Sequence, residues 1–203
     1  MLERGNFEAN KEFLKRYGGK LRGKKVLEIG CGNGSMTNFL SSLGCDVVAI
    51  DLNETYLKTA RKRFPHLKFR NMSGDDLKFE DNTFDIVVSF DLLEHIPEVK
   101  SHVFEVKRVL KSNGEYLLQT PNKLTSAIFS IYKDRSFTKW KSYHPSLQSN
   151  KSISKLFNDF DLKFCDVDYF TDWYRNKLPK ILRNINPKKF GVETNIYLQA
   201  KKT

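Results

Sequence analysis

The chain has 203 residues, of which 39% are hydrophobic, 13% aromatic and 29% charged. This length suits one domain, and the composition supplies a hydrophobic core, which excludes collagen-like and globally disordered chains. No apolar run approaches the roughly 18 residues of a membrane-spanning helix, and the first six residues lack a signal-peptide pattern. We therefore expect one cytoplasmic domain over residues 1–203.

The net charge of +11 is unevenly distributed along the chain. Residues 123–203 carry 16 Lys and Arg against 7 Asp and Glu, a balance of +9. Such a basic region favours an anionic partner, which includes nucleic acid, an acidic lipid surface and a phosphorylated small molecule. It is equally compatible with a solvated surface that keeps the protein soluble.

Residues 24–122 alternate between short apolar runs and segments of helical period, the pattern of βα units that build a parallel sheet. An N-terminal helical segment, 1–22, precedes them. The predicted strands are 25–29, 47–50, 67–69, 86–88 and 115–119, and helical spacing separates them at 36–43, 53–60 and 97–110.

The C-terminal part has a different pattern. Residues 121–148 are aromatic and basic without a clear period, as expected of a lid. Helical spacing returns at 153–160, and a helical insertion is expected at 170–190. Alternating faces predict strands near 162–169 and at 192–200. The simplest interpretation is a parallel sheet completed by an antiparallel strand pair.

A glycine-rich turn follows the first predicted strand, in the run Glu28-Ile29-Gly30-Cys31-Gly32-Asn33-Gly34. Glycines allow a sharp turn without Cβ atoms, so a ligand can lie against bare backbone beside a helix N-terminus. Asp51 ends the next strand 21 residues after Gly30, where a carboxylate can accept both hydroxyl hydrogens of a ribose. Together these features predict a ligand of the adenosine type.

The spacing of the glycines distinguishes between adenosine ligands. A dinucleotide fingerprint requires glycine or alanine at position 35, but the chain has Ser35 there and its third glycine at Gly34. Pyrophosphate binding is therefore disfavoured, and an NAD-dependent oxidoreductase is the less favoured alternative.

Further motifs follow in order along the chain. They are 73–79 (SGDDLKF), 81–88 (DNTFDIVV), 92–96 (LLEHI), 108–114 (RVLKSNG) and 120–122 (TPN). With the Gly-x-Gly-x-Gly turn after Glu28, they resemble the class I S-adenosylmethionine-dependent methyltransferases, in particular the small-molecule branch that includes the ubiquinone- and menaquinone-biosynthesis enzymes. The resemblance covers about residues 22–122. It implies an α/β fold with a doubly wound, mostly parallel seven-stranded sheet, a Rossmann-like arrangement with an antiparallel C-terminal pair and a lid insertion.

The resemblance also implies a set of cofactor-binding residues. They are Glu28, Gly30, Cys31, Gly32, Asn33, Gly34, Asp51, Leu52, Ser73, Gly74, Asp75, Phe90 and Asp91. In this assignment the turn lines the methionine moiety and Glu28 supports its ammonium group. Asp51 holds the ribose diol, while Leu52 and the segment 73–75 lie near the adenine. The carbonyl of Phe90, with Asp91, lies near the transferred methyl. Structural alternatives remain, since Glu28 can cap the turn, Asp51 can cap a helix and Phe90 can belong to the core.

The implied reaction moves a methyl group from S-adenosylmethionine to an acceptor and leaves S-adenosylhomocysteine. A sulfonium is already an activated donor, so the protein mainly aligns the acceptor. For a hydroxyl acceptor, a neutral imidazole would help to remove the proton, and His95 and His144 are the candidates. The Asn/Asp-Pro-Pro-Tyr strand end of nucleobase-methylating enzymes is absent, and Ser89-Phe90-Asp91-Leu92 stands in its place. We therefore expect methylation of oxygen.

The cysteines and histidines give no indication of a metal site. Cys31, Cys45 and Cys165 are widely spaced, and the four histidines are scattered in the sequence, so no metal-ligand cluster is expected. The cysteine usage also agrees with a reducing cytoplasm.

The basic C-terminal part determines which partner is expected. In 170–190 an apolar stripe at helical spacing, Tyr174, Leu178, Ile181, Leu182 and Ile185, either rests on an anionic membrane or packs on its own domain. We expect a small-molecule or lipid-like acceptor, anionic ones included, with peripheral membrane contact. The alternative is an RNA-directed methyltransferase or a non-catalytic nucleic-acid-binding module that stacks bases on the interleaved aromatic residues.

Overall fold

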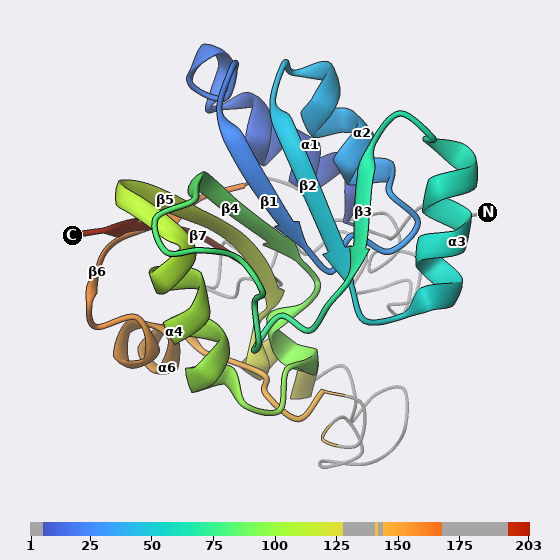
Figure 1. Cartoon of the computed structure of the whole chain (residues 1–203). Helices are drawn as coiled ribbons and strands as arrows, with labels where there is room; N and C mark the ends of the chain where they lie inside the picture. Colours follow the sequence, from blue (N-terminus) through green and yellow to red (C-terminus); the bar gives the residue numbers. More distant parts are fainter. Residues whose placement is uncertain (1–5, 128–140, 142–143, 168–194) are drawn as a thin grey trace.

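The computed structural model describes residues 6–127, 141, 144–167 and 195–203, in which helices cover both faces of one sheet (Figure 1). The strands are β1 (Lys25–Ile29), β2 (Asp46–Asp51), β3 (Lys68–Asn71), β4 (Phe84–Phe90), β5 (Leu110–Pro121), β6 (Phe160–Cys165) and β7 (Asn195–Lys202). The α-helices are α1 (Phe7–Lys15), α2 (Ser35–Ser42), α3 (Glu54–Arg63), α4 (Val99–Val109) and α6 (Asn150–Leu156), with 3-10 helices η1 (Gly18–Lys20) and η2 (Leu93–His95).

The seven strands are ordered β3-β2-β1-β4-β5-β7-β6. The first five in sequence run parallel, and β7 is antiparallel to both β5 and β6. The direction of winding reverses between β1 and β4, and open α/β sheets bind ligands beyond the carboxyl ends of the strands at such a point. The predicted fold class, with its antiparallel C-terminal pair, is confirmed.

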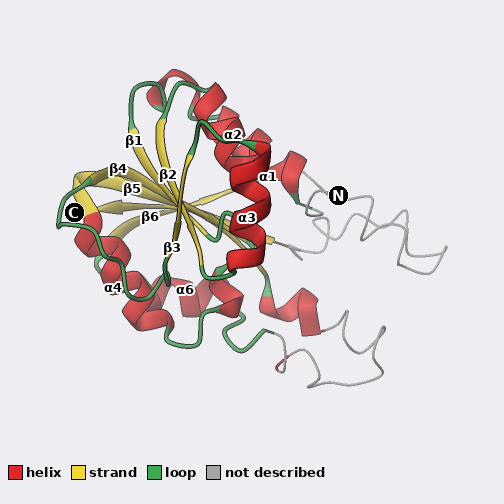
Figure 2. Cartoon of the chain, turned by 45° about the vertical axis from the view of Figure 1, so that its right-hand side comes forward, coloured by secondary structure: helices red, strands yellow, loops and turns green. Residues whose placement is uncertain are grey.

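Alternate residues of the central strands pack on opposite helical layers. Leu27 and Ile29 of β1 belong to the apolar cluster that contains α4 and α6 side chains, whereas Val26 packs with α1 and α2. Ala49 of β2 contacts the buried face of α3, on the same side as α2. Figure 2 shows this arrangement, with α1, α2 and α3 on one side of the sheet and α4 and α6 on the other.

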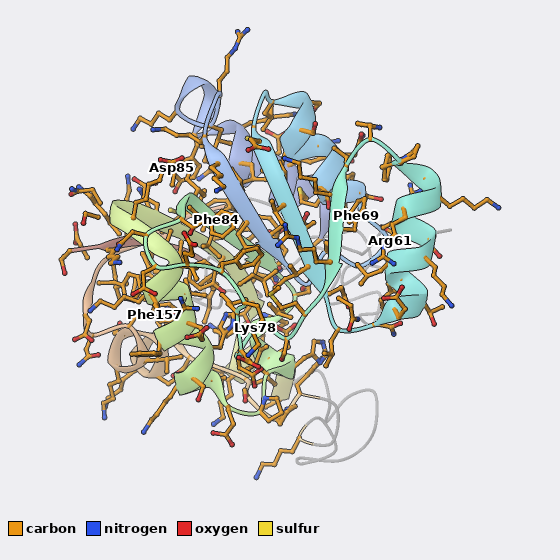
Figure 3. All side chains as sticks on the ribbon, viewed as in Figure 1. Arg61, Phe69, Lys78, Phe84, Asp85 and Phe157 are labelled. Atoms are coloured by element: carbon orange, nitrogen blue, oxygen red, sulfur yellow. The ribbon has the colours of Figure 1, made fainter. Side chains whose placement is uncertain are left out.

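One predicted helix is shorter than its apolar spacing suggests. The helical pattern runs to Phe160, but α6 ends at Leu156, and Phe160 begins β6. The backbone N–H of Phe160 donates to the Phe157 carbonyl, and the two rings lie 5.5 Å apart, so a turn reproduces the i, i+3 spacing of a helix. Phe157 lies beside α6 (Figure 3) and packs on Tyr116 of β5.

The fifth strand is longer than the predicted 115–119 because it also contains Ser112-Asn113-Gly114. β5 begins at Leu110, and its pairing with β4 shifts register between Phe84 and Ile86. Asn113 has φ = 62°, a left-handed conformation that asparagine tolerates better than most residues. The Ser-Asn-Gly motif therefore lies within β5, and the backbone departs from the extended conformation at Asn113.

Several expectations fall partly or wholly outside the described residues. These include most of the lid 121–148, the insertion 170–190 and the first residues of the last predicted strand. The division into segments and the cytoplasmic location stay predictions. Within the described parts of the chain, no helix has the length and apolar character to cross a membrane.

Gly34 holds α2 close to the neighbouring β-α unit. It is the N-cap of α2 with φ = 82°, and an added Cβ would lie 2.9 Å from Cζ of Phe69 and 3.1 Å from Cβ of Ala60. Figure 3 labels Phe69 on β3, beside α3. The third glycine of the turn is therefore required by packing as well as by backbone conformation.

We predict that Gly34→Ala lowers the free energy of unfolding by about 2–3 kcal/mol, because the substitution combines a strained backbone with a steric overlap. Urea denaturation measures the change. Gly19→Ala is the matched control, since nothing lies within 4 Å of its added Cβ, and it should change stability by less than about 0.5 kcal/mol. Equal effects of the two substitutions would contradict the packing role.

Candidate functional site

The β1–α2 turn brings bare backbone to the carboxyl edge of the sheet. The N–H groups of Gly30 and Cys31 both donate to the carbonyl of Ile50 on β2, at 2.8 and 3.0 Å. Gly30 and Gly32 have φ values of 78° and 54°, which glycine adopts without strain. An added Cβ at Gly30 would lie 2.9 Å from Cδ1 of Leu92, so a side chain at this position would have to displace Leu92.

Asp51 lies directly opposite the turn. Its Oδ2 accepts from the Gly32 N–H at 2.8 Å, and its Oδ1 accepts from the Asn53 N–H at 2.8 Å. The alternative role of helix cap belongs to Asn53, whose side chain accepts from Thr55 and Tyr56 N–H groups at the start of α3. A carboxylate has about four acceptor sites, so each Asp51 oxygen retains capacity for a ligand hydroxyl.

Two other predicted residues lie near the carboxyl ends of β1 and β2. Glu28 is buried in β1, and its Oε2 accepts from Thr37 Oγ1 of α2 at 2.5 Å, so the carboxylate faces the start of that helix. Leu52 follows β2 and is 69% exposed, although it is a large apolar residue at the edge of the sheet. An exposed leucine here can cover the face of a flat apolar ring.

The remaining residues of the turn contribute mainly to local structure. Asn33 Oδ1 accepts from both the N–H and the hydroxyl of Ser35, at 3.3 and 3.0 Å. Arg63 of α3 donates to the Asn33 carbonyl and to Ser35 Oγ. Asn33 and Gly34 therefore shape the turn and the start of α2, while the backbone N–H of Gly32 faces Asp51.

The loop after β3 lies beside Asp51 as well. The Met72 N–H donates to the Asp51 carbonyl at 3.2 Å, which brings the following residues to the same edge. Ser73 Oγ donates to Asp75 Oδ1, so these two predicted residues pair with each other. Gly74 is buried and has no room for a side chain, because an added Cβ would lie 2.9 Å from Cγ2 of Ile29.

A buried hydrogen-bond chain, which the sequence analysis missed, supports this loop from below. His102 Nδ1 lies 2.7 Å from the Gly74 carbonyl, and its Nε2 lies 2.9 Å from the Tyr116 hydroxyl, itself 2.6 Å from Ser89 Oγ. A carbonyl only accepts, so His102 Nδ1 carries the proton and Nε2 accepts from Tyr116. Burial lowers the pKa of His102, in agreement with a neutral ring. The available sequence signal was a histidine on the apolar face of α4.

At the end of β4, Phe90 and Asp91 have different environments. Phe90 is buried, and its ring lies 6.4 Å from that of Phe13 in α1, so only its backbone can reach a ligand. Asp91 has φ = 49°, and its Oδ1 accepts from Asn6 Nδ2 at 2.9 Å and Gln119 Nε2 at 3.1 Å. The N-terminal segment, β4 and β5 thus meet at this carboxylate.

The sequence predicted no cluster of histidines, but two of the four lie close together in the structure. The rings of His95 in η2 and His144 lie 4.9 Å apart, and Glu94 Oε1 is 3.9 Å from His95 Nε2. The Ser146 N–H donates to the Glu94 carbonyl at 3.1 Å and fixes the second segment against η2. The structure therefore brings both predicted catalytic histidines together, a few residues beyond the end of β4.

The fold is a doubly wound α/β sheet, with a glycine turn and the Asp51 carboxylate together at its carboxyl edge. Residues 27–118 match the model of a family described as a methyltransferase domain. Over this part the chain is similar to a methyltransferase domain, and the resemblance inferred from the ordered motifs is therefore confirmed.

Curated relatives agree with this family. A probable S-adenosylmethionine-dependent methyltransferase of Mycolicibacterium smegmatis is 30% identical over 119 residues, covering 59% of this chain and 46% of that protein. A ubiquinone biosynthesis O-methyltransferase of Xanthomonas oryzae pv. oryzae is 34% identical over 116 residues, covering 55% and 48%. The chain thus spans about half the length of the curated relatives it matches.

Solved structures share the architecture across nearly the whole chain. The YcgJ protein of Bacillus subtilis has a TM-score of 0.72 at 17% identity, covering 96% of this chain and 98% of that one. Phosphoethanolamine N-methyltransferase 2 of Haemonchus contortus, solved with S-adenosyl-L-methionine, has a TM-score of 0.70 at 18% identity, covering 97% and 53%. At these identities the likeness establishes the fold.

The buried state of His102 predicts a defined pH dependence of stability. Its pKa in the folded chain lies below the ordinary value, so the unfolded chain takes up a proton first as the pH falls. The stabilisation is complete above about pH 6.5 and is lost below it, by up to about 1.4 kcal/mol per pH unit.

We therefore expect His102→Gln to lose less stability than the wild type when the pH falls from about 7.5 to about 5.5. Urea denaturation at the two pH values measures this difference. His66→Gln, at an exposed position, serves as the control and should retain the wild-type dependence. An unchanged pH dependence in His102→Gln would contradict the buried neutral ring.

Proposed function

We propose that this chain is an S-adenosylmethionine-dependent methyltransferase that moves a methyl group to an oxygen atom of a small-molecule or lipid-like acceptor. The observation that carries the proposal is the Asp51 carboxylate, held by the N–H groups of Gly32 and Asn53 at the carboxyl edge of the sheet. A fixed carboxylate beside a glycine turn is the arrangement that binds the ribose of nucleoside cofactors.

The residues present fit the parts of this cofactor. Its ribose hydroxyls would donate to Asp51, and its adenine would lie between the exposed Leu52 and the loop at Ser73–Gly74. The methionine tail would follow the turn 30–32, with the buried Glu28 carboxylate on the side of its ammonium group. No pyrophosphate is present in this cofactor, which agrees with Ser35 in place of a dinucleotide glycine.

When bound, the cofactor supplies an activated methyl group on a sulfonium. The chain's own task is to orient the acceptor and to exclude competing water. The carboxyl end of β4, where Asp91 is tied to Gln119 and Asn6, forms the support for the methyl end. A rigid support matters because small displacements of reacting atoms reduce the rate strongly.

The pair of histidines supports an oxygen acceptor. A hydroxyl becomes a good nucleophile when its proton is removed, and neutral imidazole is a suitable base. Burial, together with neighbouring His95, lowers the pKa of His144, which keeps its ring neutral near pH 7. The O-methyltransferase name of the Xanthomonas relative points to the same acceptor atom.

We expect Asp51→Ala to weaken binding of S-adenosylhomocysteine by about 100-fold, because two hydrogen bonds to a charged acceptor are lost. Isothermal titration calorimetry measures the affinity. Asp46→Ala removes an exposed carboxylate at the opposite end of β2, where Asp46 pairs with Lys68, and should leave the affinity unchanged. Equal affinity in Asp51→Ala and the wild type would refute the site assignment.

The class of acceptor is tested by following the labelled methyl group. The full chain, incubated with methyl-labelled S-adenosylmethionine and a cell extract, should transfer label to small molecules and lipids extractable into organic solvent. The label should survive mild alkaline hydrolysis, as an ether methyl does. Label recovered mainly in precipitated RNA would instead support the nucleic-acid alternative and overturn the proposed acceptor class.

A further inference from the structure

The side chains of Glu94, His95 and His144 converge just beyond the carboxyl end of β4. Each residue offers one potential ligand atom, and these three atoms all lie within 4.8 Å of one another. Two imidazoles and one carboxylate are a donor set that zinc accepts, with one position left open for water or substrate. We infer that these three residues form a binding site for one divalent metal ion of the zinc type.

The backbone holds the ligands in place from two directions. Glu94 and His95 are consecutive residues of η2, directly after the end of β4. His144 belongs to a segment fixed by Ser146, which donates through its N–H to the Glu94 carbonyl and through its hydroxyl to the Ile96 carbonyl. The three donors therefore come from two elements that are hydrogen-bonded to each other.

The carboxylate is oriented as metal ligands commonly are. Glu94 is only 1% exposed, and its Oε2 accepts from the Thr120 hydroxyl of β5 at 3.0 Å. Its other oxygen, Oε1, faces His95 Nε2 at 3.9 Å. A hydrogen bond to one carboxylate oxygen fixes the other toward the ion, and such outer partners tune metal affinity.

The charge state also suits a cation. A buried carboxylate is costly unless a positive charge lies close to it, and a divalent ion supplies that charge. Metals bind the neutral form of imidazole and the ionised form of a carboxylate, so the three side chains offer two uncharged nitrogen donors and one negative charge.

The role of the ion rests on the proposed methyltransferase function and deepens it by naming hydroxyl-bearing acceptors as the substrate class. An ion held there would lower the pKa of an acceptor hydroxyl in its open position, so that water would take the proton and the two imidazoles would serve as ligands instead of as the base. The acceptor oxygen then forms a bond to the transferred methyl carbon as the carbon–sulfur bond breaks, and the bonding pair stays on sulfur. The charges balance, because the oxyanion and the sulfonium are both neutralised.

The test is a titration of the full chain, stripped with a chelator, with zinc ions against a chromophoric competitor. We expect the wild type to bind one ion per chain. His144→Ala and Glu94→Gln each remove a ligand and should weaken zinc binding by about 10- to 100-fold or more. Thr120→Val, which removes only the outer hydrogen bond, should weaken binding by about 10-fold. Cobalt(II) in place of zinc gives a visible absorption that reports on the coordination directly.

His66→Ala is the matched control, because it removes an exposed histidine outside the cluster and should not change zinc affinity. Calorimetry with S-adenosylhomocysteine on the same samples separates the two proposals. Unaltered zinc binding in His144→Ala and Glu94→Gln would overturn the metal site. If these variants still bind S-adenosylhomocysteine, the methyltransferase proposal would stand without the metal site. Zinc affinity lost in the cluster variants alone would support the site.

Discussion

One hydrogen bond, from the Gly32 N–H to Asp51 Oδ2, connects the two features on which the site depends. It requires β1 and β2 to run parallel in register, so that the glycine turn and the carboxylate reach the same edge of the sheet. Other parts of the site attach to the same residue, since Asn53 at the start of α3 and Met72 after β3 both donate to Asp51. A change at this carboxylate therefore acts on several elements together.

Buried polar side chains extend from this edge into the core and connect the site to the helical layers. His102 joins the loop at Gly74 to Tyr116 beneath it, and Thr120 joins Glu94 to β5. Each polar atom in these chains finds a partner, and fully satisfied networks of this kind rigidify and specify a single arrangement. The loop at Gly74 and the carboxylate of Glu94 are thus both supported through β5.

The sheet, the glycine turn and Asp51 could be predicted because each depends on residues close together in sequence: strand patterning, glycine conformation and a carboxylate at a strand end. The His95–His144 contact could not, since it joins positions 49 residues apart, one of them in the least patterned part of the chain. His102 was missed for the same reason, as its partners lie on β5 and in the loop after β3. The helix predicted up to Phe160 was too long because a turn and a helix share the i, i+3 spacing.

In the proposed function, the Asp51 carboxylate, fixed by the glycine turn, binds the ribose of a sulfonium nucleoside. The most direct measurement is a crystal structure of the chain with S-adenosylhomocysteine. The account predicts both ribose hydroxyls within about 3 Å of the two Asp51 oxygens, with the adenine against Leu52. A nucleoside bound elsewhere, or a ribose out of reach of this carboxylate, would contradict it.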